Sequence, residues 1–268
     1  MKIAFIGGGN MANAMLGGLR SSGVALDAYV LEIDAAKGKA LAETYGVRAR
    51  TTVDQWLGQC EIVVVAVKPQ QIKEAVASIS PFAQNALVVS IAAGVRASTL
   101  ARWLGHERIV RAMPNTPALI GAGITAAVAL PAVDPEQRAE ANRLLRAVGS
   151  VVWLEDEAQL DAVTAVSGSG PAYVFLFIEA LEAAATQLGL SAAHARKLAL
   201  GTFHGAARLA AESDASPAVL RDRVTSRGGT TAAALEKMNA AGIKQTIAAA
   251  VRAAAERAKE MGDELDRE

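Results

Sequence analysis

The sequence predicts an α/β domain with a parallel sheet followed by an all-α domain. Up to Leu154, short β-branched runs alternate with helical stretches, which is the pattern of parallel strands joined by helices. Beyond that residue, alanine, leucine, glutamate and arginine recur at helical spacing, and strand-like residues are confined to the Val224-Thr225 neighbourhood. The change of pattern places a domain boundary near residues 155–160. We therefore expect one domain over residues 1–157 and another over residues 158–268.

Composition excludes several functional classes. The 27 Lys+Arg residues balance 27 Asp+Glu residues, which argues against a nucleic-acid binder because such proteins normally carry a basic excess. The single cysteine, Cys60, can form neither an internal disulfide nor a metal cluster, so we expect a reducing compartment and no metal site. The longest apolar run, over residues 172–185, contains two glutamates and is shorter than the ~20 residues of a membrane span. We expect a cytoplasmic protein with no membrane partner.

The predicted strands of the first domain are short runs rich in small and β-branched residues. The run from Ile62 to Val67 has no polar alternation, as expected of a strand buried on both faces. Strands are predicted over residues 2–6, 28–31, 62–67, 87–91, 109–111, 124–130 and 151–154, with helices over residues 11–21, 35–45, 69–78, 97–104 and 135–148.

The predicted helices of the second domain cover residues 171–188, 191–213, 230–241 and 243–261. Their apolar residues lie on more than one face, and a helical part of only ~110 residues would have difficulty burying them alone. We therefore predict that subunits associate through this domain. The last helix is expected to end in a charged tail, residues 257–268, that is solvated or frayed.

A glycine-rich segment follows the first strand directly. The run Gly7-Gly8-Gly9-Asn10-Met11-Ala12 fits the pattern G-x-G-x-x-G/A, with alanine in the third place. The first glycine permits a tight turn, the second lets the backbone approach a pyrophosphate, and the alanine allows close packing of helix on strand. An acidic residue, Glu32, lies 23 residues after Gly9, close to the ~20 residues typical of this motif. The context favours a Rossmann dinucleotide-binding turn over a turn without a ligand.

The residues near the second strand bear on the choice of nicotinamide cofactor. Glu32 can accept a hydrogen bond from the ribose hydroxyls of NADH and would repel the 2′-phosphate of NADPH. The nearest cations, Lys37 and Lys39, can reach a phosphate but lack the bidentate grip of an arginine. The residues by themselves therefore favour NADH.

Further polar turns end the next strands. Ala66-Val67-Lys68-Pro69 follows the third predicted strand, and Ile91-Ala92-Ala93-Gly94 follows the fourth. Open parallel sheets bind ligands at the carboxyl ends of their strands, so these turns belong to the same rim. Asn115 and Thr116, held between two prolines, are expected at that rim as well.

Two clusters of glycine and hydroxyl residues stand in the helical half. The run over residues 167–171 begins a helix with Gly-Ser repeats, and an ordinary helix cap explains only one serine and Pro171. The run over residues 222–231 carries hydroxyls and Gly228-Gly229 straight into a helix, which offers backbone N–H groups to an anion. Capping alone remains the alternative, although it needs a single hydroxyl.

At these residues the chain resembles the pyrroline-5-carboxylate reductase family, the last enzymes of proline biosynthesis. The resemblance implies an α/β Rossmann dinucleotide-binding domain followed by an all-α dimerisation domain, with dimers often assembled into pentamers of dimers. It also implies an active site completed by the helical domain of the partner subunit. The matching segments are residues 5–12, 66–69, 90–94, 111–118, 167–173 and 217–235.

The resemblance also implies roles for individual residues. The cofactor, NADPH or NADH, would touch the Gly7–Ala12 turn, the turn from Ala66 to Lys68 with Pro69, and Ala93. The substrate would lie in the loop from Ser226 to Thr231. Glu157 and Asp214 come near the site by the same resemblance, although as lone acids we expect them to be solvated. Many members carry serine, asparagine or arginine where this chain has Glu32 and Ile33, a departure that sets the residue-based preference for NADH against the family's common preference for NADPH.

The chemistry of an imine suits this chain better than that of a ketone. Hydride transfer to a ketone makes an alkoxide and needs a proton donor, yet no lysine lies between Lys73 and Lys197. A β-hydroxyacid-type dehydrogenase would need such a lysine after Pro171. A cyclic imine can be protonated before hydride arrives. A nucleotide-binding protein without catalysis is the other alternative.

We hypothesise how the substrate, 1-pyrroline-5-carboxylate, would be held during its reduction to L-proline. The N–H groups of Gly228, Gly229 and Thr230, with Ser226, would bind its carboxylate. The hydroxyl of Thr231 would contact its ring nitrogen.

Overall fold

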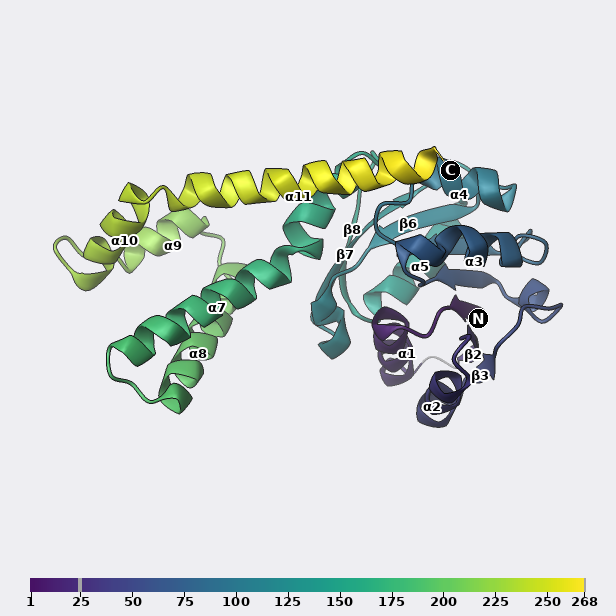
Figure 1. Ribbon diagram of the computed structural model, residues 1–268, viewed down its shortest axis with the longest axis horizontal. Coiled ribbons are helices and arrows are strands. Elements are labelled where there is room, and N and C mark those ends of the chain that lie inside the picture. The colour runs from purple at the N-terminus through teal and green to yellow at the C-terminus, as the bar shows by residue number, and fades with distance from the viewer. Residues whose placement is uncertain (24–25, 268) are drawn as a thin grey trace. The chain divides into compact units, whose positions relative to one another are not determined.

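A computed structural model describes residues 1–23 and 26–267 of the chain (Figure 1). Its centre is an eight-stranded sheet with the order β3-β2-β1-β4-β5-β6-β7-β8. Neighbouring strands are parallel except for β6 and β7, which are antiparallel. The strands are β1 (Lys2–Ile6), β2 (Asp27–Leu31), β3 (Arg48–Arg50), β4 (Ile62–Val65), β5 (Leu87–Ser90), β6 (Ile109–Met113), β7 (Gly123–Ala129) and β8 (Gly149–Trp153).

Two hydrophobic clusters cover the two faces of the sheet. Alternate residues of one strand enter different clusters, so Ile62 and Val64 of β4 face one side while Val63 and Val65 face the other. Helices α1 (Asn10–Ser21) and α5 (Pro135–Arg146) pack on the first side, and α3 (Ile72–Ile79) and α4 (Ala97–Leu104) on the second. Burial on both faces explains the continuous apolar run of β4.

The prediction of the strands was correct for seven of them and incomplete in two respects. Strand β3 was not predicted because its three residues, Arg-Ala-Arg, form an edge strand without an apolar pattern. Strand β7 runs antiparallel to β6, whereas the sheet was expected to be parallel. Only residues 114–122, with the short 3-10 helix η3 (Thr116–Ile120), join the two strands, and a parallel crossover needs roughly a dozen residues or more.

By its internal contacts the chain divides into two compact units, residues 1–169 with 253–268, and residues 170–252. The first unit keeps α6 (Gln159–Val163) and the π-helical turn η4 (Thr164–Gly168) with the sheet, beyond the boundary expected at residue 157. The long helix α11 (Ile243–Asp266) is continuous across both units.

The C-terminal tail, which was expected to be solvated or frayed, is not frayed, although several of its charged side chains are exposed. The chain is helical to Asp266, and the last turns of α11 pack on the first unit, where Ala258 and Gly262 are buried. Asp263 and Asp266 of this segment pair with the side chain of Arg96, the residue that precedes α4, so these two carboxylates have a partner in the protein. Glu268 lies outside the described residues.

The second unit consists of helices that bury little of their apolar surface. It holds α7 (Gly170–Gln187), α8 (Ala192–Ala211), the unpredicted short helix α9 (Pro217–Arg223), α10 (Thr230–Ala240) and the start of α11. The Val224-Thr225 neighbourhood is a turn after α9, not a strand. Helices α7 and α8 pack against each other, with Phe177 and Phe203 in ring contact. Among the described residues of α7, α9 and α10, no side chain is buried.

One helical stretch, Gln159–Gln187, is long and apolar enough to cross a membrane by length and composition alone. It is longer than the run measured in the sequence because α6, η4 and α7 form one continuous helical stretch. The same property is expected of a helix whose apolar face is covered by another protein chain.

Candidate functional site

A cleft of about 700 Å³ opens at the carboxyl ends of β1, β2, β3 and β4. The strand order reverses here, because β2 and β3 lie on one side of β1 whereas β4 and β5 lie on the other. This is the crevice in which open α/β sheets bind their ligands. Its lining includes Gly7, Gly8, Gly9, Glu32, Lys37, Ala66, Val67 and Lys68 from the predicted set, together with Ile33, Asp34, Thr51, Thr52, Gln71 and Glu74.

The glycine turn is built where side chains have no room. Gly7 has a φ of +95°, and a Cβ there would come within 3.0 Å of the Ala66 carbonyl oxygen. A Cβ on Gly8 would come within 2.6 Å of Leu41 Cδ1. The turn therefore requires glycine both for its backbone conformation and for its close approach to neighbouring elements.

Gly9 is different because the space that a Cβ would occupy is open, and the residue lines the cleft. It is the N-cap of α1, with φ of −71°, and a Cβ there would meet only the Ala66 carbonyl oxygen, at 3.9 Å. The first turn of α1 has no side-chain cap, so its N–H groups are available to an acceptor in the cleft. Asn10 is exposed, Met11 is half-buried, and Ala12 is buried in the core, where it brings α1 close to the sheet. A pyrophosphate could therefore approach Gly9 closely and accept hydrogen bonds from the first N–H groups of α1.

Glu32 is held against the glycine turn. Its carboxylate accepts hydrogen bonds from the N–H of Gly8 at 3.0 Å and from the N–H of Asp34 at 3.1 Å. The residue is 9% exposed, so its orientation is set by the protein before any ligand binds. Each carboxylate oxygen can accept a further hydrogen bond, which leaves Glu32 able to bind ribose hydroxyls.

The lysines near the cleft do not occupy equivalent positions. Lys37 and Lys68 line the cleft, whereas Lys39 is exposed and pairs with Glu43 on the same helix, α2 (Ala35–Tyr45). Pro69 begins the 3-10 helix η2 (Pro69–Gln71) that follows β4. Of the two cations considered for a phosphate, Lys37 lies at the cleft and Lys39 does not.

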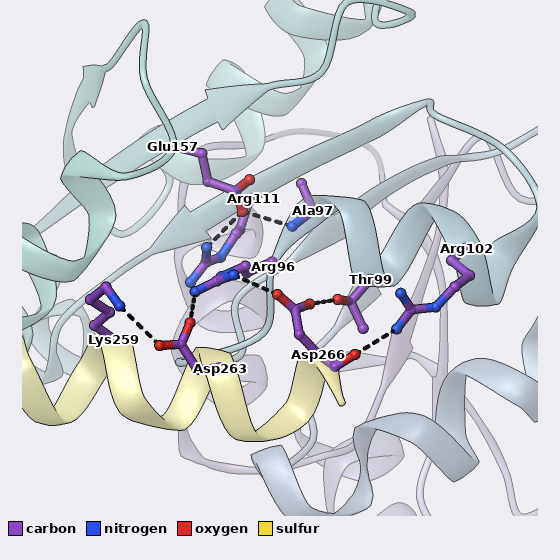
Figure 2. A network of polar contacts seen from close by, with 9 residues as sticks. All are labelled: Arg96, Ala97, Thr99, Arg102, Arg111, Glu157, Lys259, Asp263 and Asp266. Carbon is purple, nitrogen blue, oxygen red and sulfur yellow. Dashed lines mark hydrogen bonds and ion pairs between the residues drawn. The ribbon is translucent and has the colours of Figure 1, made fainter. Parts of the chain in front are cut away.

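The turn between β5 and α4, further along the rim, contacts a partly buried ion pair. Arg111, in β6, donates to Glu157 at 2.6 Å, and the same Glu157 oxygen accepts the N–H of Ala97, at the start of α4, at 2.7 Å (Figure 2). The expectation that Glu157 is solvated was therefore wrong. Arg111 is buried in an otherwise apolar strand, and a buried charge requires a partner. Asp214 is exposed, as expected.

Arg96, next to Ala97, is held by the last turns of α11 (Figure 2). Its guanidinium donates to Asp266 at 2.6 Å and also to Asp263. Burial alone would lower the pKa of Arg96, but Asp266 and Asp263 outweigh that effect and raise it. The pKa of Asp263 is lowered, first by the hydrogen bond from Lys259 and also, against the effect of desolvation, by Arg96.

Two residues singled out in the sequence, Asn115 at the predicted rim and Gly168 in the helical half, have structural roles. The Asn115 side chain accepts the N–H of Ile124 at 3.0 Å and donates to the Ser167 carbonyl at 3.2 Å, which joins η3 to the π-helical turn. Gly168 needs to lack a side chain because a Cβ would come within 2.6 Å of Met113 Cε. Packing thus explains one of the glycines that a helix cap could not.

The loop proposed for the substrate lies in the second unit, between α9 and α10. The N–H of Gly229 donates to the Ser226 carbonyl at 3.1 Å, and Gly228 has a φ of +70°, as the third residue of a type II turn requires. A Cβ on Gly229 would overlap Ser226 Oγ. In this structure the Gly229 N–H is therefore committed to the turn and not to an external anion.

The other loop residues remain accessible. Ser226, Gly228 and Thr230 are exposed, and Thr231 is half-buried in the first turn of α10. Gly229 caps this helix without a side-chain hydrogen bond, so the first N–H groups of α10 are available to an anion.

Two titratable groups lie elsewhere in the first unit. Burial raises the pKa of the Cys60 thiol to about 11, which makes it a poor nucleophile. Burial also lowers the pKa of His106, with a further contribution from Arg108. Neither side chain lines the cleft.

Sequence reasoning did not identify Arg96, Asp263 or Asp266 as members of one network. Arg111 carried a signal, because an arginine inside a β-branched run implies a buried partner. Asp263 and Asp266 are three residues apart and therefore share a helix face, but the sequence does not show what that face contacts.

Known proteins resemble this chain along nearly all of its length. A pyrroline-5-carboxylate reductase of Pseudomonas aeruginosa is 43% identical over 267 residues, which cover 98% of each chain. The structure of a pyrroline-5-carboxylate reductase from Coxiella burnetii has a TM-score of 0.91 at 41% identity and covers 97% of both chains. That of the Plasmodium falciparum enzyme with NADP bound has a TM-score of 0.86 at 31% identity and covers 98% of both chains.

Family models match both halves of the chain. Residues 2–94 match the model described as NADP oxidoreductase, coenzyme F420-dependent, and residues 157–261 match pyrroline-5-carboxylate reductase dimerisation. Together with the glycine turn and its cleft, these matches define an NAD(P)-dependent oxidoreductase with a Rossmann domain and a helical dimerisation domain. Within that class, the chain belongs to the pyrroline-5-carboxylate reductase family.

The environment of Gly9 makes a substitution there diagnostic of cofactor binding. In Gly9→Ala we expect the free energy of unfolding to change by less than about 1 kcal/mol, because alanine tolerates this backbone conformation and the methyl group has room. We expect NADH or NADPH to bind at least about tenfold more weakly, because the methyl group takes the space of the pyrophosphate. Denaturant unfolding and fluorescence titration measure the two effects.

Gly17→Ala, a glycine-to-alanine change within α1, is the matched control, since its Cβ would make an ordinary contact of 3.6 Å with Tyr45 of α2. Normal cofactor affinity in Gly9→Ala would contradict the assignment of the cleft.

Proposed function

We propose that this chain reduces the C=N bond of 1-pyrroline-5-carboxylate with NADH or NADPH and thereby forms L-proline in proline biosynthesis. The observation that carries the proposal is the cleft at the glycine turn, where no side chain caps the first N–H groups of α1, in a chain that matches members of one reductase family over 98% of its length. When bound, the reduced nicotinamide supplies the hydride.

The reaction needs little acid–base chemistry from the protein. Protonation of the imine nitrogen before hydride transfer makes the neighbouring carbon electrophilic. The C=N electron pair then passes to nitrogen as hydride adds to carbon, so the product is a neutral secondary amine. The protein has to orient the ring, hold its carboxylate and exclude water. This requirement agrees with a cleft whose lining includes no histidine among the described residues.

The proposed roles of the loop before α10 come from the family resemblance and are supported by its accessible hydroxyls and N–H groups. Ser226 Oγ and the N–H groups of Gly228 and Thr230 bind the substrate carboxylate, and the Thr231 hydroxyl contacts the ring nitrogen. Gly229 contributes by lacking a side chain beside Ser226. In the first unit, the cofactor contacts the Gly7–Ala12 turn, Glu32, the turn from Ala66 to Pro69, and Ala93.

The protein forms oligomers through the helical domain, and the proposed unit is a homodimer that further assembles into a pentamer of dimers. The support is the apolar surface that the second unit leaves exposed, including Phe175 and Leu176 of α7, which are 63% and 64% exposed. A partner subunit would cover this surface, the apolar face of the membrane-length helix included, and would complete the active site. The buried free thiol of Cys60 supports a reducing, cytoplasmic location.

The oligomer is tested by light scattering of the purified chain. We expect the mass of a dimer or a multiple of it, because exposed apolar patches of this kind mark association surfaces. A monomer at micromolar concentration would contradict the proposal.

An assay of cofactor oxidation tests the proposed reaction. Comparing NADH with NADPH in the same assay tests the role of Glu32. We expect oxidation of the reduced cofactor when 1-pyrroline-5-carboxylate is added, with NADH favoured over NADPH because a 2′-phosphate would meet the buried carboxylate. In Glu32→Gln, affinity for NADPH relative to NADH should rise about tenfold.

Asp34→Asn is the control, because it removes the same charge from the cleft edge while asparagine still caps α2. An unchanged ratio in Glu32→Gln would remove Glu32 from cofactor selection, and no oxidation of either cofactor would overturn the proposed reaction.

Thr231→Ala tests the contact with the ring nitrogen. We expect kcat/KM to fall about ten- to a hundredfold, which corresponds to the ~1–3 kcal/mol of one hydrogen bond to a charged group. Thr231→Ser keeps the hydroxyl and should retain most of the activity. Wild-type kinetics in the alanine variant would exclude Thr231 from the mechanism.

A further inference from the structure

We propose that the last two turns of α11 position the turn between β5 and α4 for the nicotinamide half of the cofactor, and that Arg96, held by Asp263 and Asp266, is the positioning residue. The inference rests on the proposed cofactor site. It assigns a task in the reaction to a C-terminal segment whose sequence suggested only a solvated tail.

The contacts of Arg96 tie the turn to the helix from several directions (Figure 2). Its two terminal nitrogens reach different carboxylates, Asp266 at 2.6 Å and Asp263 on the preceding turn of α11. Thr99 donates to the Asp266 side chain, and Arg102 donates to the Asp266 carbonyl at 3.3 Å. Helix α4 and its N-cap residue are therefore joined to the end of α11 by three side chains, those of Arg96, Thr99 and Arg102.

Backbone packing brings the same two elements together. Gly94 has a φ of +73°, and a Cβ there would come within 3.1 Å of Met261 Cβ. Gly262 is buried, and a Cβ on it would lie 3.4 Å from Arg96 Nε and 3.6 Å from the Gly94 carbonyl oxygen. Two glycines, one on each element, thus permit a close approach that larger side chains would prevent.

The other end of the turn is held independently. Glu157 accepts the N–H of Ala97 while it pairs with the buried Arg111, so this residue is anchored to β6. Arg96 and Ala97 are adjacent but have different anchors, α11 for one and the sheet for the other. The half-buried Ala93 lies three residues before Arg96, at the rim of the sheet. Its backbone position therefore depends on both anchors.

The order of the strands indicates which half of the cofactor meets this turn. The pyrophosphate would lie at the end of β1, on α1, and the adenosine ribose at Glu32, after β2. The nicotinamide half then extends to the opposite side of β1, over β4 and β5. These two strands are neighbours in the sheet and lie ~4.8 Å apart. The β5–α4 turn ends the second of these strands.

The ion pairs themselves are partly exposed, with Arg96 36% and Asp263 34% accessible at the side chain. Pairs of this kind contribute little to net stability. Their effect would instead be preorganisation, because a turn already in its bound conformation loses less conformational freedom when the cofactor arrives. We therefore expect their loss to affect cofactor binding more than folding.

The test is the double variant Asp263→Asn/Asp266→Asn in the full-length protein. We expect the Kd of the reduced cofactor, NADH or NADPH, to rise about five- to fiftyfold, within the range of typical coupling between sites. Affinity for the ADP-ribose moiety alone should stay within about twofold, because it would occupy only the β1 and β2 side. Hydrogen exchange of residues 91–97 in the cofactor-free protein should become faster.

The matched control is Glu260→Gln/Glu264→Gln. It removes the same number of charges from α11, but these residues pair with the exposed Arg257 on the same helix and do not contact the turn. It should bind both ligands normally. Asp263→Glu/Asp266→Glu keeps both charges and should recover part of the cofactor affinity.

The outcomes separate the two proposals. If the wild-type protein binds neither reduced cofactor nor ADP-ribose, the cofactor site itself is wrong. If the wild-type protein binds both and the asparagine variant weakens both equally, the network is merely structural. Unchanged cofactor affinity together with unchanged exchange in that variant would also overturn the positioning role.

Discussion

The reversal of strand order beside β1 is the constraint on which the rest of this structure depends. Because β2 and β3 extend to one side and β4 to β8 to the other, the helices after β1 and β4 leave toward opposite faces and a crevice opens at the carboxyl edge. The crevice is usable only because Gly7 and Gly8 bring the backbone close to neighbouring side chains. Glu32 accepts the Gly8 N–H from the adjoining strand end and joins the two sides of the turn.

Carboxylates fix the turns along the carboxyl edge of the sheet. Each of the turns after β1 and β5 is fixed by a carboxylate from a distant segment, Glu32 for the first and Glu157 for the second. A carboxylate withdrawn from water, almost fully for Glu32 and partly for Glu157, costs free energy unless it accepts hydrogen bonds, and here the backbone N–H groups of the turns supply them. The same hydrogen bonds thus stabilise the carboxylate charge and fix the backbone of the turn. The helical unit shows the complementary situation, because its apolar faces lack cover within one chain and require a second chain.

Sequence reasoning succeeded where one element carries its own signal. The continuous apolar run of β4, the glycine turn before α1 and the start of α10 after Gly228-Gly229 are local patterns with local causes. It failed where a long-range contact decides the outcome. Glu157 was interpreted as a lone acid because Arg111 is 46 residues away in the chain, and the partner of Asp263 and Asp266 was missed because Arg96 is 167 residues before Asp263. Strand β3 was missed because an edge strand of three residues needs no apolar pattern.

By itself the sequence determined the fold class, the dinucleotide turn and the family, because hydrophobic period and glycine spacing are properties of short segments. Only the tertiary structure decided the antiparallel direction of β7, the commitment of the Gly229 N–H to its own turn, and the return of α11 to the β5–α4 turn. These features depend on loop length, backbone angles and pairing between distant charges. The physical reason is that a carboxylate or an N–H group has the same chemistry in any sequence, whereas its partner is chosen by the folded chain.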